Sequence, residues 1–227
     1  MIAVAKARPS ERAEFIKRTY AHLAGAVGAF IVVEFLLFQL GIAGWLFNLV
    51  VASRFAWLGI LGGFALLGYL SSSMTAKADD VSTQYMGLGI YVVGEALIFA
   101  PLLYLAAVFS DATVIPTAAI ITLAMFAGLT AIVFTTGKDF TFLGGALKIG
   151  GMVAIGLIIA SVIFGFNLGV FFAFAMVAFA STAILYKTSR VMLHYSTTQY
   201  VAASLELFAA VMLLFWYVLR IVLASRR

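Results

Sequence analysis

The sequence predicts an all-α integral membrane protein, a polytopic transmembrane bundle of seven helices, and two observations carry this prediction. Hydrophobic residues make up 65% of the 227 residues and charged residues only 10%, whereas soluble domains carry roughly 25% charged residues. Too little polar surface remains to face water on every side, so bilayer hydrocarbon is the solvent that fits this composition. The apolar residues also form long continuous runs without strict alternation, which favours helices over a β-barrel.

Seven apolar segments are each long enough to cross about 30 Å of hydrocarbon as a helix. We predict these spans at residues 20–40, 55–74, 86–109, 114–134, 144–164, 167–185 and 200–223. The connections between them are short, so consecutive helices should be antiparallel neighbours. Residues 20–227 are therefore expected to form one membrane domain behind a cytoplasmic N-terminal tail of residues 1–19.

Lysine and arginine predict the orientation, because cytoplasmic loops carry an excess of both. Most of these side chains precede the first span or lie near loops on the same side: Lys6, Arg8, Arg12, Lys17, Arg18, Lys77, Lys138, Lys187 and Arg190. The opposite loops offer only Arg54. We expect a cytoplasmic N-terminus in a multi-pass cell membrane protein of the bacterial inner membrane type. Arg226 and Arg227 would then lie outside, which leaves a re-entrant last segment as an alternative to seven full spans.

No motif of an enzyme is present in the sequence. The chain has no cysteine, which excludes thiolate catalysis, disulfides and cysteine-based metal sites. The HExxH, GxSxG, P-loop and dinucleotide-binding motifs are also missing. The formal net charge of +5 comes from residues at helix ends and in short loops, so it indicates membrane topology and no nucleic-acid partner. We expect a protein that is not an enzyme, has no cofactor and has the lipid bilayer as its main partner.

Four ionisable residues lie well inside the predicted spans: Glu34, Glu95, Lys148 and Glu206. Charged groups in a membrane are costly and usually face the bundle interior or a water-filled cavity. At about 1.5 Å per residue, Glu95, Lys148 and Glu206 fall in the inner half of the bilayer and Glu34 in the outer half. We expect the first three to form a cluster. It could be a pathway for cations or protons, or a buried ion pair that only fixes helix register, and both interpretations stay open.

Four segments carry a pattern that resembles a known family. The chain reads Phe-Ile-Lys-Arg-Thr-Tyr at 15–20, Phe-Thr-Thr-Gly-Lys-Asp-Phe at 134–140, Ile-Leu-Tyr-Lys-Thr-Ser-Arg at 184–190 and Tyr-Val-Ala-Ala-Ser-Leu-Glu-Leu-Phe at 200–208. Together these segments are similar to the Bax inhibitor-1 family, the TMBIM or YccA-like membrane proteins, and the similarity covers essentially the whole chain. The resemblance implies that the last helix is central and wrapped by the other six. It also implies the activity proposed for that family, a pH-sensitive leak of calcium.

The resemblance further implies a pair of aspartates that gates the pore, one just after the sixth span and one within the seventh. This chain has Lys187 and Ala210 at those positions. Lys187 would repel a cation where the family offers a carboxylate, and calcium prefers several oxygen ligands. Glu206 precedes Ala210 by one helical turn and could partly substitute for the lost aspartate. The sequence does not identify a set of metal ligands.

Two functions from different classes remain as hypotheses. The first is a leak channel or transporter for calcium or protons, with Glu95 and Glu206 as pathway groups and Lys148 as their counter-charge. The second is an interaction protein without transport, which modulates a membrane protein partner such as a membrane-bound protease. The resemblance implies this possibility, because some bacterial members of the similar family are linked to membrane-bound protease quality control, and residues 1–17 would then contact the partner. Ion flux through the purified protein separates the two hypotheses.

Overall fold

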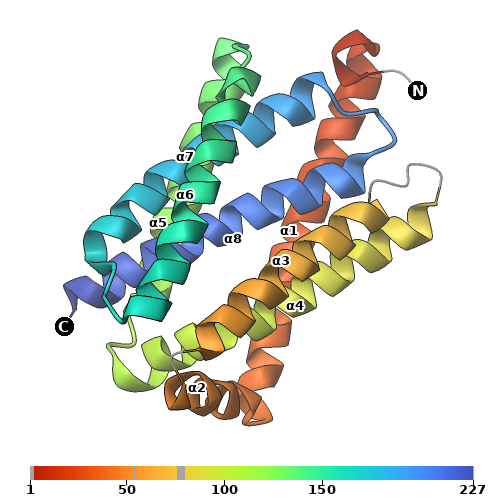
Figure 1. The fold of residues 1–227 in the computed structure, drawn as a ribbon. Helices are drawn as coiled ribbons and strands as arrows, with labels where there is room; N and C mark the ends of the chain where they lie inside the picture. Colours follow the sequence, from red (N-terminus) through yellow and green to blue (C-terminus); the bar gives the residue numbers. More distant parts are fainter. Residues whose placement is uncertain (1–2, 54, 76–79, 227) are drawn as a thin grey trace.

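The computed structural model describes residues 3–53, 55–75 and 80–226, and this part of the chain is a bundle of helices without a regular strand (Figure 1). The α-helices in chain order are α1 (Pro9–Gln39), α2 (Ile42–Ala52), α3 (Ala56–Thr75), α4 (Val81–Phe109), α5 (Val114–Thr136), α6 (Gly144–Phe164), α7 (Gly169–Leu193) and α8 (Tyr200–Ser225). Two short 3-10 helices, η1 (Val4–Lys6) and η2 (Thr141–Leu143), precede α1 and α6. Arg54, Lys77 and Arg227, which entered the prediction of orientation, lie outside the described residues.

Seven of the described helices, all except α2, are long and apolar enough to cross a membrane. This confirms the predicted fold class and each of the seven predicted spans. Two helices extend well beyond the predicted bounds: α1 begins at Pro9 instead of residue 20, and α7 ends at Leu193 instead of residue 185. Hydropathy marks only the part of a helix that lies in hydrocarbon. It therefore does not detect polar turns that continue a helix beyond the membrane.

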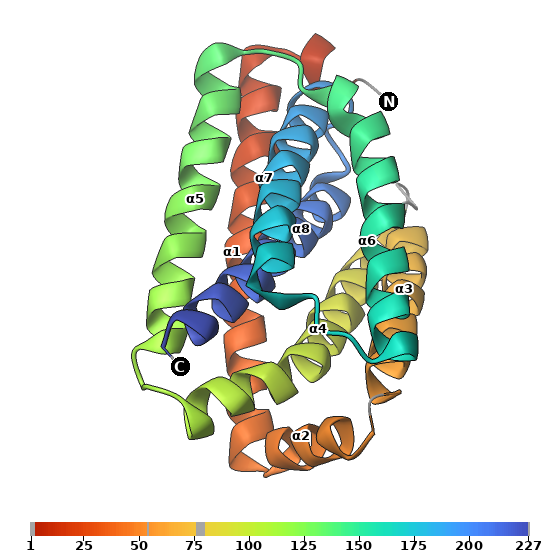
Figure 2. The same ribbon diagram turned by 60° about the vertical axis from the view of Figure 1, so that its left-hand side comes forward.

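The helix α8 lies at the centre of the bundle (Figure 2). It packs against α1, α3, α4, α5 and α7, and a larger share of it is buried than of any other described span. Its residues are apolar on every side, the composition of a helix that is surrounded by others. By contrast, α6 is the least buried described span and packs mainly against α7. The expectation of a central last helix is thus met, with α6 at the periphery.

The short helix α2 was not predicted. At 11 residues it cannot span the bilayer, and it lies across one end of the bundle (Figure 1). Gly41, at φ +73°, lets the chain turn between α1 and α2. Gly44 packs against α4 so closely that a Cβ there would lie 3.1 Å from the Tyr104 ring. The predicted spans end at residue 40 and resume at residue 55, because an apolar segment of this length is too short to cross the bilayer.

Contacts between loops and helix ends define the two ends of the bundle. At the N-terminal end, the Phe140 N–H donates to Ser189 Oγ over 2.9 Å, which joins the α5–α6 connection to α7. At the same end, His22 Nε2 lies 2.6 Å from the Tyr85 hydroxyl, joining α1 to α4. The helix α8 starts there and runs to the opposite end, where the C-terminus lies (Figure 1). The last segment is therefore a full span in this structure, and the cytoplasmic location of the N-terminus stays a prediction.

The described part of the predicted tail of residues 1–19, which begins at residue 3, is largely structured. Val4 is fully buried in the main core, and its N–H donates to the Tyr195 carbonyl after α7 over 2.9 Å. Pro9 suits the first helical position of α1 because the missing N–H has no partner there in any helix. Arg18 and Glu14, one turn apart on α1, form an exposed ion pair of 2.7 Å. The segment before the first span is thus mostly a docked extension of α1.

We predict that Val4→Asp releases this docked segment, because a carboxylate at a fully buried position has no partner. Limited proteolysis in detergent should show new cleavage before Pro9, and the thermal midpoint should fall by the equivalent of about 1–3 kcal/mol. The exposed neighbour Ala5 gives the matched control, since Ala5→Asp should change neither. Equal behaviour of the two variants would contradict the docking.

Candidate functional site

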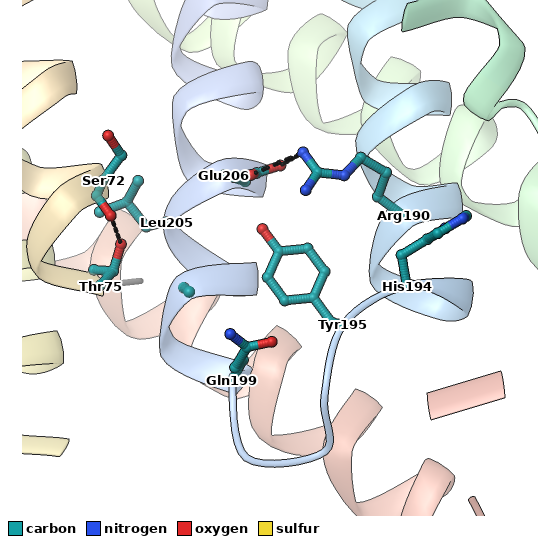
Figure 3. A pocket seen from close by; sticks show the side chains of 9 residues that line it. Ser72, Thr75, Arg190, His194, Tyr195, Gln199, Leu205 and Glu206 are labelled. Carbon is teal, nitrogen blue, oxygen red and sulfur yellow. Dashed lines mark hydrogen bonds and ion pairs between the residues drawn. The ribbon is translucent and has the colours of Figure 1, made fainter. Parts of the chain in front are cut away.

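A cavity of about 210 Å³ lies at the N-terminal end of the bundle between α3, α7 and α8 (Figure 3). Its lining is mixed. Polar side chains come from all three helices and from the α7–α8 connection, namely Ser72, Thr75, Arg190, His194, Tyr195, Gln199 and Glu206, and the apolar Ala202 and Leu205 complete the lining. Polar linings of this kind are uncommon in a bundle of apolar helices and mark candidate pathways.

Arg190 and Glu206 form an ion pair across this cavity. Arg190 projects from α7 and Glu206 from α8, and the two side chains point toward each other (Figure 3). The Arg190 Nη1 atom lies 3.2 Å from Oε1 and 3.4 Å from Oε2 of Glu206. The guanidinium also lies over the Tyr186 and Tyr195 rings, at 5.8 and 5.6 Å from their centroids. Glu206 therefore has a cationic partner on the next helix.

Tyr195, in the α7–α8 connection, is buried beside this ion pair. Burial first, and then the Glu206 carboxylate, raise the pKa of Tyr195. The side chain is consequently a neutral hydroxyl at physiological pH and keeps its proton. It closes the cavity wall next to Glu206 without adding a charge.

Lys187 lies deeper than Arg190 and links three helices. From α7, its Nζ donates to the Glu206 main-chain carbonyl on α8 over 3.0 Å. Its ammonium group also interacts electrostatically with the Glu95 carboxyl on α4. Because α7 continues past residue 185, Lys187 is part of a helix and is not in a loop as the predicted bounds implied. We call Glu95, Lys187, Arg190 and Glu206 the charge cluster.

Lys148 is not part of the charge cluster, and the expected grouping with Glu95 and Glu206 is wrong in this respect. It is exposed on α6 and has no ion pair within the described ranges. The side of α6 that contacts α7 carries Gly144 and Gly150, where an added Cβ would lie 2.9 Å from Tyr186 and 3.2 Å from Phe179. The depth of a residue along its span does not determine whether its side chain faces the interior of the bundle, and the Lys148 side chain does not.

Glu95 is the most buried acid of the charge cluster. It is 1% exposed, and its Oε2 atom has no hydrogen-bond partner. The Tyr91 hydroxyl, one helical turn earlier on α4, lies beside the carboxyl. The sequence prediction of an acid inside the bundle is thus met for Glu95.

A sequence model described as "Inhibitor of apoptosis-promoting Bax1" (Bax1-I) matches residues 12–227. The chain belongs to the Bax inhibitor-1 family. It is also similar to an uncharacterized protein of Pseudomonas aeruginosa, at 29% identity over 185 residues that cover 80% of this chain and 71% of that protein. No solved structure matches the chain.

Lys187 and Ala210 are the two positions where this chain was expected to differ from the Bax inhibitor-1 family, and the structure describes both. Lys187 lies in the charge cluster, and Ala210 is buried on α8 one turn after Glu206. Across the described residues, no group of three or more His, Cys, Asp or Glu side chains could hold a metal ion. The site thus combines carboxylates with fixed cations of the chain itself.

Glu34 lies apart from the charge cluster. It is 6% exposed on α1, and neither of its carboxylate oxygens has a hydrogen-bond partner. It shares a helix face with the buried Phe30 and Leu37, on the helix that packs against α4 and α8. A carboxyl held in this way is costly and marks a functional position by default in a membrane span.

We predict that Lys187→Met destabilises the protein and that Lys148→Met does not. The first variant removes a charged donor from the Glu206 carbonyl and a counter-charge from Glu95, which should cost about 1.5–3 kcal/mol. The second removes an exposed side chain of the same type. Thermal unfolding of both purified variants in one detergent makes the comparison, and an equal loss of stability would contradict the placement of Lys187.

Proposed function

We propose that this member of the Bax inhibitor-1 family passes protons across the membrane, by a route that starts at the cavity of Figure 3 and continues to Glu95. One observation carries the proposal: Glu95 is 1% exposed at the middle of the bundle, yet it keeps a carboxylate oxygen without a partner. A carboxyl in that state can bind and release a proton without breaking a protein hydrogen bond. The neighbouring cavity supplies the polar access that proton exchange needs.

The fixed cations favour protons over calcium as the transported species. Calcium takes 6–8 oxygen ligands, and the described residues offer no cluster of three acidic or histidine side chains. Lys187 and Arg190 both lie where a divalent cation would pass, so like-charge repulsion opposes it. A proton needs a single carboxyl and a chain of hydrogen bonds.

The opposite charges of the charge cluster suit a proton carrier because they keep the net charge small. Arg190 pairs with Glu206 at the cavity, and the Lys187 ammonium group interacts electrostatically with Glu95 deeper in the bundle. Glu95 can therefore hold its carboxylate form beside an ammonium group and its protonated form beside the Tyr91 hydroxyl. Neither form leaves an isolated acid charge in the apolar core.

The alternative function, modulation of a membrane protein partner, depends on residues 1–17 being free to contact that partner. Val4 is fully buried against the chain itself, and α1 already begins at Pro9. The segment that would serve as a handle is thus partly occupied. This favours transport as the first function to test.

We predict that Glu95→Gln lowers proton flux at least about tenfold in proteoliposomes that contain a pH-sensitive dye. Glutamine keeps the shape of the side chain and cannot exchange a proton in the same way. Glu14→Gln, at the exposed acid of α1, is the matched control and should conduct like the wild type. Equal flux through Glu95→Gln and the wild type would contradict the route.

A second prediction concerns the missing aspartates. The double variant Lys187→Asp/Ala210→Asp should gain a calcium leak that the wild type lacks, because it removes one cation and adds two carboxylates beside Glu206. Calcium entry into dye-loaded proteoliposomes measures the gain. Lys148→Asp makes the same type of charge change outside the charge cluster and should stay calcium-tight. A calcium-tight double variant that is stably folded would contradict the assignment of these two positions.

A further inference from the structure

A second cavity, of about 340 Å³, lies between α4, α7 and α8. The ends of α4 and α8 and the start of α7 lie together at the end of the bundle that carries the C-terminus (Figure 1). We call this cavity the C-terminal cavity. Its volume is within the range of about 300–1,000 Å³ that is usual for ligand sites in proteins. It shares no lining residue with the cavity of Figure 3, so it is a separate site.

The floor of the C-terminal cavity is apolar. Leu102 of α4, Ala173 of α7 and Leu223 of α8 line it, and all three are buried. The rim is exposed at Val170 on α7 and at Ala224 on α8. An apolar floor of this kind, reached from outside the bundle, suits an acyl chain, because lipid tails are as apolar as leucine side chains.

One charged side chain, Arg220 of α8, lines the C-terminal cavity. Arg220 is half-buried, and no ion pair or hydrogen bond joins it to any other residue that the structure describes. The arginine of the other cavity, Arg190, differs in this respect, because it pairs with Glu206 over 3.2 Å. The charge of Arg220 is therefore left for a ligand of opposite sign.

Asn167, in the α6–α7 connection, gives the C-terminal cavity a second polar group. Its Oδ1 atom accepts from the Gly169 N–H over 2.9 Å, so the NH2 group is the donor that this side chain presents. A guanidinium is a donor only, and it binds phosphate oxygens through parallel N–H bonds. The polar groups of the cavity thus favour an anion.

Large apolar side chains are exposed around this end of the bundle. Phe109 at the end of α4, and Phe171 and Phe174 near the start of α7, are each more than half exposed. Such side chains face hydrocarbon in a helix that spans a membrane. Arg220 precedes the end of α8 at Ser225 by five residues, or roughly 8 Å along the axis. Its charge is therefore close to the level where hydrocarbon meets the lipid headgroups.

We infer that the C-terminal cavity binds one anionic phospholipid from the leaflet at this end of the bundle, with the lipid phosphate on Arg220 and one acyl chain along Leu102 and Leu223. Basic pockets between membrane helices recognise anionic headgroups. Inorganic phosphate would leave the apolar floor uncovered, whereas the phospholipid of the surrounding bilayer fills both parts of the cavity. A zwitterionic headgroup carries a cation that Arg220 repels. The inference does not depend on proton transport.

Native mass spectrometry of the full-length protein, freed of lipid in detergent, measures the binding of phosphatidylglycerol and of phosphatidylcholine with the same acyl chains. We expect one phosphatidylglycerol per chain, bound at least about tenfold more tightly than phosphatidylcholine. Arg220→Gln should reduce this binding to the level of phosphatidylcholine. Arg226→Gln, at an exposed arginine after the same helix, is the matched control and should leave it unchanged. Equal binding of the two lipids, or equal effects of the two substitutions, would overturn the inference.

A substitution at the rim tests the apolar part of the cavity. Val170→Trp places a large side chain at the cavity mouth and should weaken phosphatidylglycerol binding at least about fivefold. Val153→Trp, at an exposed position of α6, makes the same change elsewhere and should have no effect. Wild-type affinity of a Val170→Trp protein that unfolds at the wild-type temperature would overturn the placement of the acyl chain.

Competition identifies the source of the anionic group. Oleate at the concentration of the lipid, and inorganic phosphate at millimolar concentration, are added separately to the complex with phosphatidylglycerol. We expect neither to displace the lipid. Displacement by inorganic phosphate would show a phosphate site without an acyl contribution, and displacement by oleate would show a fatty-acid site. Either result would overturn the assignment to a phospholipid.

Discussion

An ammonium group inside an apolar bundle needs an acceptor on the helices around it, and Lys187 finds one on α8. Its Nζ donates to the Glu206 carbonyl over 3.0 Å, and its charge also interacts with the Glu95 carboxyl on α4. Because charges in a low-dielectric interior are costly unless paired, this contact holds α7 against α8 at the height of Glu206. The Arg190–Glu206 pair one turn farther along α7 extends the same contact to the cavity. The position of the central helix relative to its neighbours therefore depends on this cation.

The core differs in character between the two ends of the bundle. Toward the N-terminal end it holds a polar cavity and the charge cluster. Toward the opposite end it holds Glu34 and the apolar helix α2, which packs against α4. The two ends differ in charge as well, since fixed cations accompany the acids at one end, whereas both Glu34 oxygens lack a partner.

Much of the fold could be predicted from the sequence, because apolar length is a strong signal in a membrane protein. All seven spans are confirmed, and Glu95 is inside the bundle as its cost in lipid requires. Three features escaped. Hydropathy identifies segments long enough to span the bilayer, so the 11-residue α2 falls in the predicted connection between residues 40 and 55. Hydropathy also does not show that polar turns continue α7 to Leu193, which places Lys187 within a helix instead of just after the sixth span. Lys148 is exposed on α6, because only tertiary contacts decide which side of a helix faces the bundle interior.

The central claim is that the charge cluster, with its fixed cations Lys187 and Arg190, carries protons and excludes calcium. The most direct measurement is proton and calcium flux through the same preparation of wild-type protein, reconstituted at known density and compared with protein-free vesicles. The account predicts proton flux clearly above the protein-free vesicles and calcium flux equal to theirs. A calcium leak through the wild-type protein, or proton flux no greater than that of protein-free vesicles, would contradict it.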